Sequence, residues 1–129
     1  MTARTKPAPL RGEWEMRVAI TGVAGYVGSV LSAELLARGH EVRGLDNLMR
    51  GGDALLGMYG NPAFCFCPGD IRDDAAVRRT VTGVDAVVHL AAIVGDPACA
   101  RDPALARAVN YAASLQIAQA ALEMGVRRN

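Results

Sequence analysis

Neither an excess of one charge nor a long apolar run occurs in this sequence. The 14 lysines and arginines nearly balance the 13 acidic residues, giving a net charge of +1, and no basic run is interleaved with aromatic residues. Nucleic-acid binding, which needs a clustered basic surface, therefore has little support. The longest apolar stretches are far shorter than the roughly 20 residues of a membrane span. We expect no nucleic acid and no membrane as a partner, and a cytoplasmic location.

Cysteine is also scarce. The three cysteines are Cys65, Cys67 and Cys99. Because Cys65 and Cys67 alternate along an apolar segment, they would share one face of a strand, where small buried thiols are commoner than a disulfide or a metal site. A zinc site needs four ligands, and His40 and His89 lack the required spacing. We therefore predict buried thiols and no metal.

Lysine occurs once, at Lys6, in an amino-terminal stretch without hydrophobic periodicity. Residues 1–15 contain two prolines and one glycine, and they lack the apolar core of a signal peptide. We predict a disordered tail over 1–15 and one domain over 16–129. A basic targeting arm is the weaker alternative, because it would rest only on Arg4, Lys6 and Arg11.

The most informative segment runs from Arg17 to Gly39. Its short apolar run, Val18–Ile20, predicts a buried parallel strand. The period then changes to three and four, which predicts a helix from Tyr26 that ends at Gly39 in a left-handed cap. The apolar face of that helix is expected to hold Val27, Val30, Leu31 and Leu35.

Three glycines separate this strand from this helix. Gly22 would allow the tight bend, Gly25 would let a phosphate approach the backbone, and Gly28 would let the helix lie close to the sheet. The first amides of the helix are unpaired and carry partial positive charge, so a pyrophosphate would fit there. Taken alone, the triplet fits an ordinary glycine-rich turn equally well.

An acid in the expected place favours the dinucleotide interpretation. The next apolar segment, Glu41–Leu45, ends in Asp46, 18 residues after Gly28. A carboxylate at this spacing accepts hydrogen bonds from a ribose diol, each worth about 1.5–3 kcal/mol. It also repels a 2′-phosphate. Asp46 therefore predicts NAD rather than NADP.

Two further strands are predicted, over Ala63–Cys67 and Asp85–His89. Asp70 and Ile71 follow the first of them, where ligands gather in open parallel sheets, and they could flank an adenine. Independently, Asp73 or Asp74 could cap a helix that ends at Thr82. Small residues follow the fourth strand, where a cofactor could pass close by: Leu90, Ala91 and Ala92.

The last predicted element is an alanine-rich helix over Ala104–Met124. Asp102 could cap it, and Pro103 suits its first turn. Asn110 lies in its interior, which indicates a tertiary partner because asparagine is a mediocre helix former. The apolar face of the helix is expected to hold Leu105, Val109, Ala112, Leu115 and Ala118.

His89, at the end of the fourth predicted strand, is interpreted as a hydrogen-bonded strand-end residue rather than a base, since no nucleophile is paired with it.

Five motifs in order carry a family resemblance over Met16 to Arg128. They are 21–28, 45–48, 69–73, 89–92 and 109–110. Together they resemble the extended short-chain dehydrogenase/reductases, and most closely the NAD-dependent epimerase/dehydratase branch that acts on nucleotide sugars. The resemblance implies an α/β fold with an incomplete, Rossmann-like, doubly wound parallel sheet. The expected strand order is 3-2-1-4, with the cofactor crevice between strands one and four.

The resemblance also implies cofactor contacts at matching positions. The pyrophosphate group would be held by Gly22, Gly25 and Gly28 and by the backbone of Tyr26 and Val27. The adenosine would be held by Asp46, Asn47, Asp70 and Ile71. The path to the nicotinamide ribose would be lined by Leu90, Ala91 and Ala92, and Asn110 matches the family's helix asparagine, which helps to position the catalytic lysine.

One departure from the family is decisive. Its chemistry uses a tyrosine and a lysine four residues later, but the positions four residues after the three tyrosines hold valine, alanine and leucine. We therefore interpret the chain as the truncated, inactive NAD-binding portion of an oxidoreductase or isomerase, with a nucleotide sugar as partner only of the full-length parent. The alternative is a stand-alone, non-catalytic dinucleotide-binding or regulatory module, self-associating through the open edge of the fourth strand.

Overall fold

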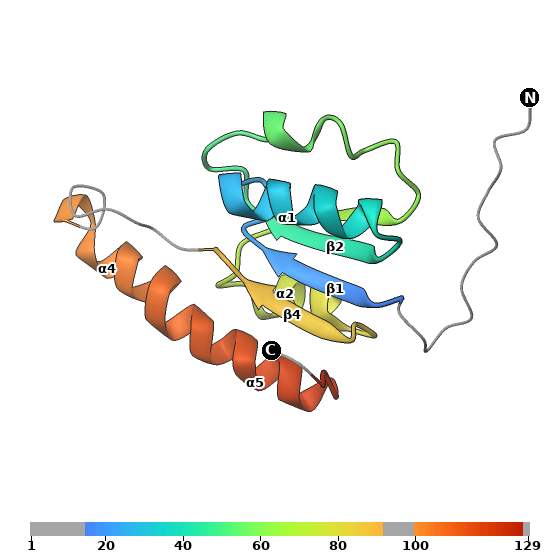
Figure 1. The fold of residues 1–129 in the computed structure, drawn as a ribbon. Coiled ribbons are helices and arrows are strands. Elements are labelled where there is room, and N and C mark those ends of the chain that lie inside the picture. Colours follow the sequence, from blue (N-terminus) through green and yellow to red (C-terminus); the bar gives the residue numbers. More distant parts are fainter. Residues whose placement is uncertain (1–14, 92–99, 128–129) are drawn as a thin grey trace, which may run out of the picture.

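The computed structural model describes residues 15–91 and 100–127. Within them, four parallel strands form one sheet in the order β3-β2-β1-β4 (Figure 1). This confirms the predicted Rossmann-like fold and its strand order. Each strand starts within one residue of its predicted position, and the bounds are Arg17–Thr21 for β1, Glu41–Asp46 for β2, Phe64–Pro68 for β3 and Ala86–His89 for β4.

Helices cover both faces of the sheet, and each face has its own apolar core (Figure 1). On one face lie α1 (Tyr26–Ala37) and the 3₁₀ turn η1 (Asp53–Leu55). On the other lie α2 (Asp74–Val81) and a long helical segment. That segment is continuous through α4 (Pro103–Arg107), the π-helical turn η2 (Ala108–Ala112) and α5 (Ala113–Glu123).

The predicted helix boundaries are present. After α1, Gly39 has φ +88°, and its amide donates to the carbonyl of Leu36. The Asp73 side chain accepts from the amide of Ala75 at the start of α2. In the same way, Asp102 caps α4. These bonds satisfy backbone groups that a helix end would otherwise leave unpaired.

The prediction of the buried face of α1 is wrong in part. Val27 and Val30 are 59% and 56% exposed, and the small residues Gly28 and Ser32 are buried instead. The Ser32 hydroxyl donates to the carbonyl of Gly28, so its burial leaves no polar atom unpaired. Helix α1 lies so close to the glycine turn (residues 22–28) that only small side chains fit beneath the first turns of the helix.

The buried face of the last helix also differs from the prediction. Ala112 and Leu115 are exposed, whereas Ala113 and Ile117 are buried. The π-helical turn at Ala108–Ala112 explains the difference, because it holds more residues than an α-helical turn and rotates the following positions. A uniform helical period therefore misplaces Ala112 and Leu115.

The thiols are less buried than predicted. Cys65 is exposed and Cys67 is partly buried, because β3 is an edge strand whose outer face is only partly covered. Both thiols are free, and Cys99 lies outside the described residues. Most of the predicted tail also lies outside them. No helix in the described ranges is long and apolar enough to cross a membrane.

Candidate functional site

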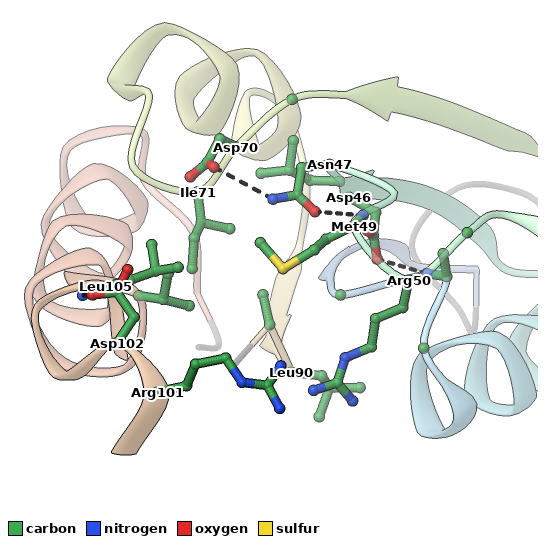
Figure 2. A pocket seen from close by; sticks show the side chains of 18 residues that line it. Asp46, Asn47, Met49, Arg50, Asp70, Ile71, Leu90, Arg101, Asp102 and Leu105 are labelled. Atoms are coloured by element: carbon green, nitrogen blue, oxygen red, sulfur yellow. Dashed lines mark hydrogen bonds between the residues drawn. The ribbon is translucent and has the colours of Figure 1, made fainter. Parts of the chain in front are cut away.

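A cavity of about 360 Å³ opens at the carboxyl ends of the strands, where the sequence places the cofactor. It brings together residues from the loops after all four strands (Figure 2). Its walls include most of the predicted contacts: Gly22, Gly25, Asp46, Asn47, Asp70, Ile71, Leu90 and Ala91. Sequence reasoning missed other lining residues, among them Ala24, Met49, Arg50 and Arg101.

The remaining predicted contacts lie elsewhere. Tyr26 is 85% exposed in the first turn of α1, and neither it nor Val27 lines the cavity. Gly28 is buried beneath the loop, and Asn110 lies on the exposed side of the π-helical turn. Ala92 is outside the described residues. Cofactor contacts by these five residues remain predictions, as do those by the eight residues that line the cavity.

The three glycines differ in what requires them. A Cβ on Gly22, which has φ +73°, would lie 2.8 Å from the amide nitrogen of Ala91. A Cβ on Gly28 would overlap the carbonyl oxygen of Gly22. By contrast, a Cβ on Gly25 would meet only that oxygen, at 3.3 Å, and the residue has φ −74°. Of the three positions Gly25 therefore leaves the most room for a side chain, because a Cβ there would need the Gly22 carbonyl to move by only a few tenths of an ångström. A ligand that approaches the backbone is a further reason for glycine at this position.

Asp46 is held at the edge of the glycine turn. One carboxylate oxygen accepts from the amide of Ala24 at 3.0 Å, and the other accepts from the amide of Leu48 at 2.8 Å. Leu48 has φ +59°, an uncommon conformation for a non-glycine residue. The two amides fix the carboxylate facing the cavity, and each oxygen retains a lone pair for a ligand hydroxyl.

Asp70 lies across the cavity from the glycine turn. The Arg72 side chain donates to both of its carboxylate oxygens, at 2.8 Å and 2.6 Å. Hydrogen bonding from Arg72 is the main cause that holds the pKa of Asp70 well below its ordinary value. Asn47 also donates to Asp70, at 3.4 Å (Figure 2). Asp70 therefore stays anionic at neutral pH and can only accept hydrogen bonds.

A family model described as the NAD dependent epimerase/dehydratase family matches residues 18–129. The chain belongs to this family. The match covers the four strands, apart from the first residue of β1, and every residue that lines the cavity. It confirms the resemblance inferred from the five motifs. NAD, the predicted cofactor, is the cofactor of the family.

Individual relatives agree with this assignment. The chain is 36% identical, over 115 residues, to a UDP-glucose 4-epimerase from Mycolicibacterium smegmatis, covering 88% of this chain and 37% of the relative. A dTDP-glucose 4,6-dehydratase from Streptomyces venezuelae, solved with NAD bound, superposes with a TM-score of 0.79 at 33% identity, covering 86% and 37% of the two chains. A Thermus thermophilus UDP-glucose 4-epimerase, solved with NAD, superposes with a TM-score of 0.74 at 35% identity. The match covers 86% of this chain and 35% of that chain. The chain thus spans little more than a third of the length of these relatives.

In this epimerase/dehydratase chain, a hydrogen-bonded series joins the end of β1 to the π-helical turn. The Thr21 hydroxyl oxygen accepts from the amides of Leu90 and Ala91, so its proton is available for Nδ1 of His89, 2.5 Å away. The other ring nitrogen, Nε2, is then the one that carries hydrogen, and it donates to the Ser114 hydroxyl at 2.9 Å. Ser114 donates in turn to the carbonyl of Asn110. His89 is therefore a hydrogen-bonded strand-end residue, and both its nitrogens are engaged.

This series requires neutral His89, and burial lowers the pKa of its imidazole. Below about pH 6.5 the unfolded chain binds a proton at this histidine that the folded chain resists. The free energy of unfolding should therefore decrease as the pH is lowered from about 6.5, until the pH reaches the lower pKa of His89 in the folded chain. We expect His89→Gln, which can accept from Thr21 and donate to Ser114, to remove this slope. Urea denaturation of both proteins from about pH 7.5 to 5 measures the difference, and equal slopes would contradict the assignment.

Proposed function

We propose that residues 16–129 form the NAD-binding portion of a nucleotide-sugar epimerase or dehydratase. One observation carries the proposal: a single cavity joins the glycine turn, the carboxylate of Asp46 and the Asp70–Ile71 pair. These are the three groups that a dinucleotide needs, namely a phosphate cradle, a ribose acceptor and an adenine site. Gly25 lines this cavity and has no side chain, so a phosphate can approach its backbone.

Each part of the cavity then has one role. Asp46 accepts from the adenosine ribose while its bonds to Ala24 and Leu48 keep it in place. Asp70 accepts from the adenine amine, and Ile71, which is 5% exposed, packs beside the ring. Leu90 and Ala91 line the path toward the nicotinamide ribose. Bound NAD would supply the hydride acceptor.

The proposal assigns binding and not catalysis to residues 16–129. Proton transfer in the family uses a tyrosine with a lysine four residues later, and Lys6 is the lone lysine of this sequence. We expect no turnover of UDP-glucose or dTDP-glucose by this chain with NAD. Chromatographic analysis of the sugar products after prolonged incubation tests this, and any sustained turnover would contradict it.

The binding proposal is tested by calorimetric titration with NAD and with NADP. We expect NAD to bind, and NADP to bind at least about tenfold more weakly because its 2′-phosphate would face the Asp46 carboxylate. Absence of binding to either dinucleotide, or a preference for NADP, would contradict the proposal. A melting curve recorded on the same sample establishes that the chain is folded during the titration.

A further inference from the structure

Two arginine side chains extend into the mouth of the cavity from different parts of the chain. Arg50 follows β2, and Arg101 lies two residues before the start of α4. Figure 2 shows both guanidinium groups reaching toward the space between them, beside Leu90. Both arginines line the same cavity as Gly25 and Asp46.

Neither guanidinium group has a hydrogen bond or an ion pair within the ranges that the structure describes. The acids of the cavity are already engaged: Asp46 by two backbone amides, Asp70 by Arg72 and Asp102 by the amide of Leu105. Other arginines of this protein do find carboxylates, as in the pairs Arg17–Glu41, Arg38–Glu34 and Arg78–Asp74.

Two unpaired cations facing one cavity repel each other unless an anion lies between them. A guanidinium group offers a planar set of donors that matches phosphate oxygens, and such charge-assisted bonds are about twice as strong as neutral ones. The amino end of α1, next to Gly25, adds backbone donors and partial positive charge on the same side. The chemical class that satisfies all three groups is a nucleoside diphosphate.

We propose that Arg50 and Arg101 clamp the diphosphate group of the dinucleotide between them, over Gly25. This rests on the proposed function, and it adds two side-chain contacts to a subsite otherwise built from backbone amides. A diphosphate could also come from a nucleotide sugar. The shared cavity with Asp46 assigns the clamp to the dinucleotide, because that carboxylate positions the adenosine ribose next to the diphosphate.

The test compares Arg50→Gln, Arg101→Gln and the double variant with Arg79→Gln as matched control. Arg79 is an exposed arginine on α2 that does not line the cavity. Each protein is titrated with ADP-ribose, adenosine and UDP, by calorimetry or by NMR for weak binding. We expect ADP-ribose affinity to fall about tenfold in each single variant and about a hundredfold in the double variant. Adenosine affinity and the control should stay within about twofold of the wild type.

Melting curves separate a binding effect from unfolding. Because the side chains of Arg50 and Arg101 are exposed, their substitution should leave the melting temperature unchanged. Unchanged ADP-ribose affinity, with NAD still bound by the wild type, would overturn the clamp and leave the proposed function standing. Equal losses for adenosine and ADP-ribose, or a larger loss for UDP, would also overturn it. Failure of the wild-type chain to bind ADP-ribose and NAD would overturn both proposals.

Discussion

Gly28→Ala should strongly destabilise the fold, whereas Gly25→Ala should affect the fold far less and strongly weaken NAD binding. An added Cβ at Gly28 would overlap the Gly22 carbonyl and press on the Val23 backbone, neither of which is a flexible side-chain end. Overpacking typically costs about 1–3 kcal/mol, and a clash with backbone belongs at the upper end of that range, which is a large share of the stability of a small domain. At Gly25 the backbone is extended, and an alanine Cβ would meet only the Gly22 carbonyl oxygen, at 3.3 Å, a tight contact that a shift of a few tenths of an ångström relieves.

Urea denaturation and NAD calorimetry on the same samples separate the two effects. Gly57→Ala is the matched control, because a Cβ there has nothing within 4 Å. We expect Gly25→Ala to unfold at a urea concentration much closer to that of wild type than Gly28→Ala does, and to bind NAD at least about a hundredfold more weakly, since its methyl group would occupy the phosphate position. A normal NAD affinity of Gly25→Ala would contradict the proposal that a phosphate binds at this turn.

Asp46→Asn should lower NAD affinity by about a hundredfold and reduce the preference for NAD over NADP. The substitution keeps the size of the side chain but replaces one acceptor oxygen with a donor. That change removes a charge-assisted bond to the ribose, worth about 1.5–3 kcal/mol. It also leaves the amide of Ala24 or of Leu48 without its acceptor, which loosens the glycine turn.

Calorimetry with both dinucleotides measures this effect, with Asp53→Asn as control. Asp53 is exposed in η1 and does not line the cavity. Loss of NAD affinity together with a relative gain for NADP is the expected pattern, because removal of the carboxylate also removes its repulsion of a 2′-phosphate. An unchanged ratio between the two affinities would show that Asp46 does not face the ribose.

The fold and most of the cavity follow from sequence because their signals are local and consecutive. The run of Val18–Ile20, the glycine turn and Asp46 define strand, bend, helix and strand in order, and right-handed crossovers then leave few sheet orders to consider. Residues that directly follow strands must gather at one edge of a parallel sheet. This is why Gly22, Asp46, Asp70 and Leu90 could be placed together without coordinates.

Other features depend on tertiary contacts that no local pattern contains. Val27 and Val30 are exposed because the close approach of Gly28 to the glycine turn sets the rotation of α1. The π-helical turn at Ala108–Ala112 changes the helical period, and it contains no proline or glycine by which the sequence would indicate the change. Arg50 and Arg101 occur in segments without periodicity, and only the folded chain shows that they share one cavity.

Chemical-shift mapping of NAD binding by NMR is the most direct test of where the dinucleotide lies. The largest amide shifts should fall on Gly22, Ala24 and Gly25, and on the segments 46–48 and 69–71. A smaller hollow at the opposite ends of the strands, lined by Arg17, Arg43 and Ala63 among others, should be unaffected. Shifts confined to that hollow, or a glycine turn left unperturbed at saturating NAD, would contradict the account.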